Sequence, residues 1–218
     1  MDLEEYKRRY PRPEEAAPGW DAISRRLGPI YPGQEPLHCA PVISSLLGGP
    51  DPLDGISAYQ CRDGGIDHLH FCTFGYTMLY YEEEAVGDDF SNFGFEMTFR
   101  LASKLPSAEQ PMWAFNMLQN IARYVFESGK RFREYQWISS GPIRLEYETD
   151  IVGLAFLPDP VVAPIDSPHG RVEFIQAFGL TRSELDVLKS GSRRCEEIIA
   201  QHREINPLLV TDLVRKDG

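Results

Sequence analysis

The sequence predicts an α+β fold in one domain, with a mixed, mainly antiparallel sheet and flanking helices. Residues 93–101 alternate apolar and polar side chains, which is the pattern of a half-buried strand. Residues 109–128 instead repeat apolar side chains every three or four positions, which is the pattern of an amphipathic helix. Because helices and strands do not alternate regularly along the chain, α+β is favoured.

The N-terminal half is expected to hold two helices and then a run of strands. Residues 1–18 form a polar lead-in with a helix that ends at Pro11, and the main domain is expected to span 19–218. A helix follows at 19–27, and a helical turn or short helix is expected at 41–47. Three apolar stretches before an acidic loop are predicted to be strands: 56–61, 68–74 and 76–81.

The C-terminal half starts from the two strongest patterns. The helix at 109–128 has Pro111 near its first turn, where proline is tolerated, and Gly129 at the position of a C-terminal stop. A capping box of Thr181 and Glu184 predicts the start of a later helix. The other expected elements are strands at 151–157 and 172–180, a helical stretch at 192–202 and a last strand at 208–213.

Composition and charge exclude several classes of protein. The 218 residues carry a formal net charge of -11, which argues against nucleic-acid binding and suits docking onto a basic partner. No apolar run of about 18 residues is present, and the charged N-terminus lacks the apolar region of a signal peptide, so no membrane association is expected. Four cysteines without CxxC spacing indicate reduced thiols in a cytoplasmic protein: Cys39, Cys61, Cys72 and Cys195.

The stretch LLGGPDPLDGIS, residues 46–57, cannot be a helix or a central strand. Pro50 and Pro52 lack an N–H donor and fix φ, and Asp54 with Gly55 is a turn pair. The segment is therefore predicted to be a rigid connector that launches a strand. It is not a phosphate loop, because no lysine is available to reach a phosphate.

One row of side chains has the chemistry of a metal site. His68, His70 and Cys72 alternate along a predicted strand and so share one face, and His38 or Cys39 could complete a zinc site. The alternative is that Cys72 is a small core residue and the histidines are hydrogen-bonded. We favour that alternative, because structural zinc sites show spaced ligand pairs, so no metal or other cofactor is expected. A metal-dependent hydrolase or nuclease using His68 and His70 remains the second functional hypothesis.

Motifs for nucleophilic catalysis are absent, and the acidic loop is the more informative feature. The sequence contains no G-x-S-x-G elbow and no H-E-x-x-H pair. Carboxylates cluster at Glu82, Glu83, Glu84, Asp88 and Asp89. Charge runs of this kind are usually solvated loops, and a role facing a basic partner is favoured over catalysis.

Five segments in order carry a family resemblance: GGPDPLDGIS, HLHFCTFG, FGFEMTFRL, IARYVFESG and LLVTDL. This combination resembles the Suppressor of fused domain family from about Trp20 to Arg215, and the chain is similar to the first lobe alone, as in single-domain bacterial members. The resemblance implies a non-enzymatic, cytoplasmic protein. The animal member clamps a transcription-factor peptide between two lobes by adding it as a strand to sheet edges.

The resemblance also implies a binding site and a class of partner. Tyr80 corresponds to a groove tyrosine and Asp88 to a groove acid, and with Glu82, Glu83 and Glu84 these are the predicted partner contacts. Bacterial members are implied to be immunity proteins that neutralise toxins, and a basic toxin would suit this acidic chain. The alternative partner is a peptide bound at a sheet edge. A stand-alone structural domain that dimerises through a sheet edge is a third hypothesis, and the oligomeric state is left open.

Overall fold

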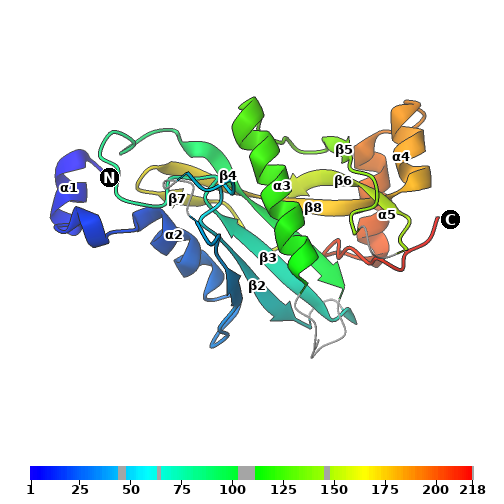
Figure 1. Cartoon of the computed structure of the whole chain (residues 1–218), viewed down its shortest axis with the longest axis horizontal. Coiled ribbons are helices and arrows are strands. Elements are labelled where there is room, and N and C mark those ends of the chain that lie inside the picture. The colour runs from blue at the N-terminus through cyan, green and yellow to red at the C-terminus, as the bar shows by residue number, and fades with distance from the viewer. Residues whose placement is uncertain (44–47, 63–64, 103–110, 145–147, 218) are drawn as a thin grey trace.

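The structure is a computed structural model that describes residues 1–43, 48–62, 65–102, 111–144 and 148–217. Figure 1 shows its helices at both ends and across the middle of one long sheet. The described helices are α1 (Leu3–Arg9), η1 (Pro13–Glu15), α2 (Pro18–Leu27), α3 (Met112–Ser128), α4 (Arg182–Lys189) and α5 (Cys195–Ile205). The described strands are β1 (Leu37–Cys39), β2 (Gly55–Cys61), β3 (His68–Phe74), β4 (Phe90–Ala102), β5 (Trp137–Ser139), β6 (Ile151–Pro158), β7 (Ile165–Ser167) and β8 (Gly170–Thr181).

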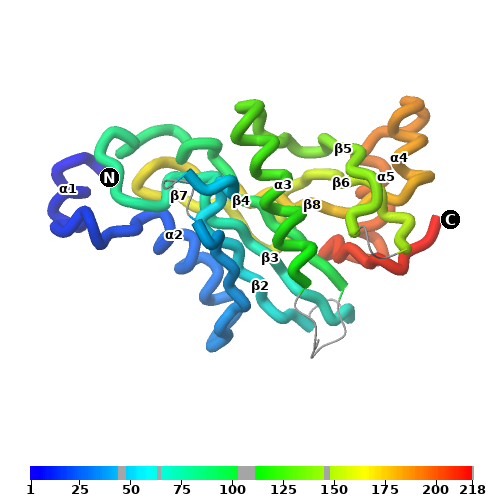
Figure 2. The backbone as a smooth tube through the Cα atoms, in the orientation of Figure 1, coloured from blue at the N-terminus to red at the C-terminus, as the bar shows by residue number. Residues whose placement is uncertain are grey.

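Within the described residues, the strands form one eight-stranded sheet in the order β1-β2-β3-β4-β8-β6-β5, and β7 pairs with β8. Every pairing is antiparallel except that of β4 with β8, which is parallel. Figure 2 shows these two strands side by side through the centre, although they are far apart in the sequence. The predicted α+β fold with a mixed, mainly antiparallel sheet is confirmed.

Helices cover both faces of the sheet. One face of β4 carries Phe95, Met97, Phe99 and Leu101, which pack in one apolar cluster with α3, as the alternation predicts. On the opposite face, α2 packs over the β2–β3 end and α4 with α5 over the β6–β8 end. The polar side chains of β4 lie between these two clusters, and they are buried: Glu96, Thr98 and Arg100.

The helix boundaries follow the predicted chain signals. Helix α3 ends at Gly129, whose φ of 67° is the left-handed conformation that glycine adopts freely. Helix α4 begins at the Thr181 N-cap, and the capping box with Glu184 is present in both directions. The second C-terminal helix occupies Cys195–Ile205, three residues beyond the predicted start and end. None of the described helices is long and apolar enough to cross a membrane.

Three predictions of secondary structure are wrong. Residues 76–81 form no strand, and 41–43 form no helix, while 44–47 lie outside the described residues. Instead of a strand at 208–213, the chain makes one isolated parallel bridge between Thr211 and Leu101. Nothing in the sequence indicated β1, β5 and β7, because strands of three residues are too short to show periodicity. All four cysteines are free thiols.

Candidate partner-binding surface

The irregular segment 75–81 replaces a predicted strand, and a buried carboxylate holds its first part. Glu96 accepts hydrogen bonds from the Thr73 hydroxyl at 2.7 Å and the Gly75 N–H at 3.0 Å. It also accepts from the N–H and the hydroxyl of Thr77, at 3.1 and 2.6 Å. Burial raises the pKa of Glu96 to about 7, and these donors oppose the rise. The Glu96 carboxylate therefore accepts the hydrogen bonds that a neighbouring strand would otherwise accept from this segment.

The second part of the segment is held by the first turn of α2. The Leu79 carbonyl accepts hydrogen bonds from the N–H groups of Gly19 at 3.0 Å and Trp20 at 3.3 Å. These donors have no partner inside the helix, so the contact satisfies both elements. The approach requires glycine, because a Cβ on Gly19 would lie 1.9 Å from the Met78 carbonyl oxygen.

Gly19→Ala is expected to lower the free energy of unfolding by about 1–3 kcal/mol, because α2 must move away from Met78. The matched control is Gly28→Ala at the other end of the same helix. Gly28 has helical φ and ψ of -52° and -47°, and its Cβ would lie 3.4 Å from the Ser24 carbonyl oxygen, so little loss is expected. Urea denaturation compares the two variants, and equal stability of both would contradict the proposed close contact.

Tyr80 belongs to segment 75–81, and it is 43% exposed. Its hydroxyl interacts with the carboxylate of Asp54, and burial raises the pKa of both groups. Asp54 comes from the connector at 46–57, so that connector contributes directly to the surface. Sequence reasoning placed Asp54 only in a turn, because nothing local shows which side chain will face it.

The described part of that connector is tied to one flank of α3. The side-chain amide of Gln119 bonds both backbone groups of Leu53, accepting from the N–H at 3.4 Å and donating to the carbonyl at 3.2 Å. Arg123 forms an ion pair with Asp51 one turn further along the helix. The prediction of a rigid connector therefore agrees with these contacts. These contacts hold Asp54 of the connector in place against Tyr80.

Helix α1 packs against the acidic loop through Tyr6, which is fully buried. The Tyr6 hydroxyl accepts a hydrogen bond from the Glu82 N–H at 3.2 Å and contacts Nε2 of His169 at 2.8 Å. Because Nδ1 of His169 faces the Met78 carbonyl at 3.2 Å, Nδ1 carries the proton and Nε2 accepts from Tyr6. The Tyr6 ring also stacks on Tyr81 with 4.7 Å between centroids. The lead-in thus contacts the loop directly.

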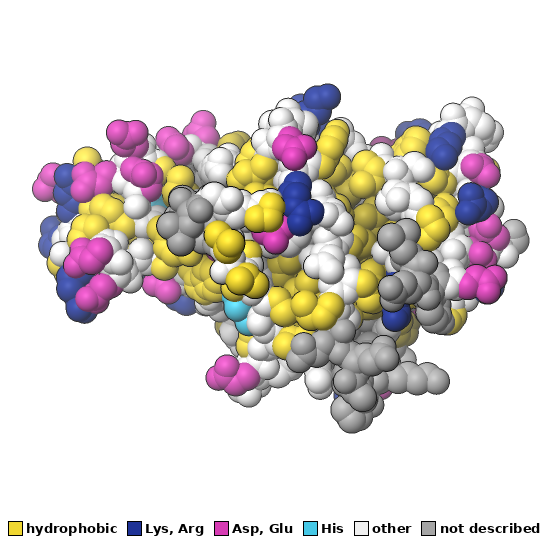
Figure 3. Space-filling view, in the orientation of Figure 1, with side chains coloured by type: hydrophobic (Ala, Val, Ile, Leu, Met, Phe, Trp, Pro, Cys, Tyr) yellow, Lys and Arg dark blue, Asp and Glu magenta, His cyan; other side chains and the backbone are white. Residues whose placement is uncertain are grey.

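The carboxylates of the loop fall into two groups. Glu83 forms an ion pair with Lys7 of α1 at 2.7 Å, and Glu82 accepts from the Glu84 N–H at 3.3 Å, so these two acids fix the loop. Glu84 and Asp88 are exposed, as is Asp89. Figure 3 shows acidic side chains gathered at the end of the molecule formed by α1 and this loop. The exposed acids and Tyr80 are therefore the groups available to a partner.

The candidate zinc row lies inside the protein. His68 is 1% exposed, and its Nδ1 donates to the Ile66 carbonyl at 2.7 Å. Cys72 is fully buried in the apolar cluster under α2. His38 and Cys39 lie on β1, two strands from β3, which is roughly 10 Å. Among the described residues, no three His, Cys, Asp or Glu side chains are placed to hold a metal ion.

His70 belongs to a buried polar network. Its Nε2 donates to the Asp159 carboxylate at 3.1 Å, and its Nδ1 is hydrogen-bonded to the Tyr31 hydroxyl, so both ring nitrogens have partners. Burial and the Arg100 charge lower the pKa of His70 to about 4 and keep the ring neutral. Since His68 and His70 are both buried, the hydrolase hypothesis has no solvent-exposed histidine in this row.

Asp159 is the centre of the network. Arg100 donates to it through two nitrogens at 2.6 and 3.1 Å, and Thr98 donates at 2.7 Å. The N–H groups of Val161 and Val162 each donate at 2.8 Å, which fixes the turn after β6. Burial opposes ionisation, but His70 and Arg100 hold the pKa of Asp159 well below its usual range, and Arg100 is the partner that is charged. The network is a buried, fully paired support beneath the sheet.

With this geometry established, comparison with known proteins gives the family. The model of the Suppressor of fused protein family matches residues 49–216, which is more than half of the chain. The chain belongs to the Suppressor of fused family. The match begins at the glycine pair of the connector that holds Asp54, and it includes Tyr80 and the acidic loop.

Two curated relatives are named Suppressor of fused homolog. The Homo sapiens and Mus musculus proteins are 33% and 32% identical to this chain over 208 residues. The alignments cover 90% of this chain, which spans 43% of the length of each relative. These two relatives are therefore more than twice as long as the region they share with this chain.

Two solved structures have a similar fold. A chain from the Sufu–Fu complex crystal structure superposes with a TM-score of 0.84 at 30% identity, covering 94% of this chain and 93% of that one. The crystal structure of Drosophila Suppressor of Fused gives a TM-score of 0.83 at 29% identity, covering 94% of this chain and 52% of that one. These similarities agree with the predicted resemblance to a Suppressor of fused lobe.

Proposed function

We propose that this chain is a non-enzymatic binding protein that holds a protein partner against the surface formed by Tyr80, Glu84 and Asp88. Glu82 and Glu83 support the same surface by fixing the acidic loop. The observation that carries the proposal is an exposed tyrosine on a segment whose backbone is held by Glu96, Ser91 and α2, followed directly along the chain by a loop with exposed carboxylates. Binding residues on loops fixed by a rigid scaffold lose little entropy on contact.

The charge of the chain supports a basic partner. A net charge of -11 and the exposed acids of the loop would steer a basic protein toward Tyr80. We further propose the role of a cytoplasmic, bacterial-type immunity or regulatory protein, with a basic toxin as the partner. The Sufu–Fu complex is a family structure determined with a second component, which supports a protein partner for this chain.

The proposed contact uses side chains and not a sheet edge. Among the described residues, the edge strands of the sheet are β1, β5 and β7, and each of them has three residues. None of these strands carries Tyr80 or the acidic loop. Addition of a partner strand at β1, β5 or β7 would therefore use backbone groups other than those of the proposed contact residues.

Affinity capture from native cells tests the proposal while the partner is still unidentified. Four baits are compared by quantitative mass spectrometry: the wild type, Tyr80→Ala, the double variant Glu84→Lys with Asp88→Lys, and Asp186→Lys. Asp186 is an exposed acid on α4 and controls for a change of charge alone. We expect one protein to be captured by the wild type and by Asp186→Lys, and its capture to fall about tenfold on the other two baits. A tenfold loss of affinity corresponds to about 1.4 kcal/mol of binding free energy.

Two results would contradict the proposal. Equal capture by all four baits would show that Tyr80 and the loop are not the contact. Turnover of a substrate by the purified wild type would show that the protein is an enzyme. Circular dichroism of each bait separates a lost contact from a lost fold.

A further inference from the structure

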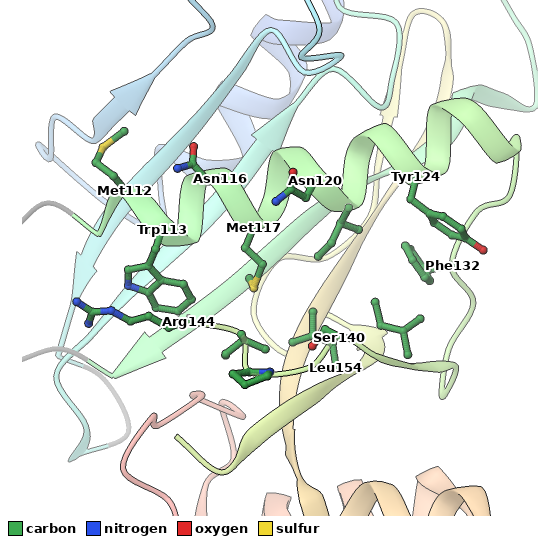
Figure 4. Close-up of a pocket in the computed structure, with 14 residues that line it drawn as sticks. Met112, Trp113, Asn116, Met117, Asn120, Tyr124, Phe132, Ser140, Arg144 and Leu154 are labelled. Carbon is green, nitrogen blue, oxygen red and sulfur yellow. The ribbon is translucent and has the colours of Figure 1, made fainter. Parts of the chain in front are cut away.

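A groove runs between α3 and the β5 end of the sheet, on the opposite flank of α3 from the connector. Its volume is about 730 Å³, and its described lining residues come from α3, β5, β6 and the segments next to β5. Figure 4 shows Trp113 and Met117 pointing from α3 toward Leu154 and Ser140, with Tyr124 and Phe132 at the other end. Helix α3 covers the centre of one face of the sheet. On that same face no described helix covers β5 and β6, and the groove lies there.

Helix α3 has a second row of large apolar side chains beside its core stripe, and two of them, Trp113 and Met117, are only partly buried against the core. The core stripe is fully buried and includes Ala114, Leu118 and Val125. At 100° per residue, Trp113, Met117 and Tyr124 fall within one narrow sector beside that stripe. Tyr124 is 50% exposed and lies at the groove rim, as does Met112 at 44%. A row of large apolar side chains that is only partly covered is typical of a surface that another element covers.

The charged side chains among the described groove-lining residues are basic, although the whole chain is acidic. Arg144 is the charged residue among the described groove-lining residues, and it lies over the Trp113 ring at 5.9 Å. A second hollow continues the groove past Tyr124 and Phe132, and its described lining contains Lys130, Arg131 and Arg133 but no acid. Arg131 is paired with Glu173 at 3.6 Å, and the others add positive charge at that end. Basic ends favour an acidic occupant.

The dimensions of the groove favour a helix over an added strand. From Trp113 to Tyr124 the lining follows α3 for about 16 Å, which matches three turns of a second helix beside it. Strand β5 has three residues, and pairing with β6 uses the backbone of Gln136 and Ser140 on the inner side. Because inward and outward backbone groups alternate, only those of Trp137 and Ser139 in β5 point away from β6, which is a short edge for the addition of a strand.

We propose that the α3–β5 groove binds an acidic amphipathic helix of a partner protein, distinct from the contact at Tyr80. Apolar side chains of that helix pack on Trp113, Met117 and Tyr124. Acidic residues at its two ends face Arg144 and the Lys130–Arg133 turn. Since α3 separates the groove from the connector and Tyr80, the two surfaces can be occupied together.

The probe is a yeast-displayed library of 18-residue peptides. Leu, Ile, Phe, Met or Trp occupies positions at helical spacing, and Glu, Lys, Gln or Ala occupies the others. The library is selected on the wild type alone, and the selected peptides are then measured on Met117→Glu. We expect Glu to be enriched over Lys, and the selected peptide to bind the wild type about tenfold more tightly than Met117→Glu by fluorescence polarisation.

Matched variants separate groove binding from general effects. Ile205→Glu places the same charge at an apolar residue on α5 that is 83% exposed, and it should bind as the wild type does. Lys130→Glu with Arg133→Glu should weaken binding, whereas Arg182→Glu with Lys189→Glu on α4 should not. The four basic residues are all exposed, so these variants report on the groove even if Met117→Glu does not fold.

Several results would overturn the proposal. Enrichment of Lys over Glu, or of peptides that Met117→Glu binds equally well, would exclude an acidic helix in the groove. Failure to select any peptide would do the same. Light scattering that shows a dimer lost in Met117→Glu would assign the groove to a second copy. Since the test leaves Tyr80, Glu84 and Asp88 unchanged, its failure does not affect the proposed function.

Discussion

Replacing Asp159 with alanine is expected to lower the free energy of unfolding by about 3–5 kcal/mol. The substitution leaves the Arg100 guanidinium, which is 1% exposed, without its carboxylate partner. It also leaves the Thr98 hydroxyl and the N–H groups of Val161 and Val162 without their acceptor. Removing one partner of a buried pair costs far more than the pair contributes, because the remaining charge stays desolvated.

Asp166→Ala is the matched control for this prediction. Asp166 lies on β7, in the chain between β6 and β8 that also holds Asp159, and it is exposed. Its removal should lower the free energy of unfolding by no more than about 0.5 kcal/mol. Guanidinium denaturation followed by circular dichroism measures both variants. Similar midpoints for Asp159→Ala and Asp166→Ala would show that the buried network does not support the sheet.

Two buried groups should make opposite contributions to stability between pH 4.5 and 7. Burial raises the pKa of Glu96 from 4.5 to about 7, so its contribution is fully present below 4.5 and lost as pH rises through 7. Burial and Arg100 lower the pKa of His70 from 6.5 to about 4, so its contribution is present above 6.5 and lost as pH falls through 4. Each shift corresponds to about 3 kcal/mol, and the two nearly cancel in the wild type.

Glutamine substitutions separate the two contributions. Glu96→Gln removes the raised carboxyl, so its stability relative to wild type should fall by about 3 kcal/mol on acidification from pH 7 to 4.5. His70→Gln removes the buried imidazole, so its relative stability should rise over the same interval. Urea denaturation at several pH values gives the slopes. Parallel curves for the wild type and both variants would contradict the assignment.

Long periodic segments could be predicted from the sequence, and segments with remote partners could not. The alternation in β4 and the stripe in α3 are local patterns, and both elements are present. Residues 76–81 form an apolar stretch that is typical of a strand, but their backbone is held by Glu96, Ser91 and the first turn of α2. A carboxylate and a helix end can replace a neighbouring strand without leaving a signal in the segment that they hold.

The candidate site shows the same division. Tyr80 and Asp88 can be named from the sequence because they lie within the region that resembles the family, and their role in binding stays a prediction. The interaction between Tyr80 and Asp54 could not be predicted, because the turn pair Asp54-Gly55 does not indicate which group the Asp54 side chain will face. The contact of Tyr6 with the acidic loop joins residues far apart in the chain, and the polar composition of the lead-in gave no sign of it.

The parallel pairing of β4 with β8 has a consequence for synthesis in the cell. Strand β4 ends at residue 102, but β8 begins only at residue 170, so the edge of β4 stays uncovered while the intervening chain is made. At about 5–20 residues per second, that interval lasts several seconds. An unpaired apolar strand invites aggregation, so newly made chains are expected to depend on chaperones until translation passes β8.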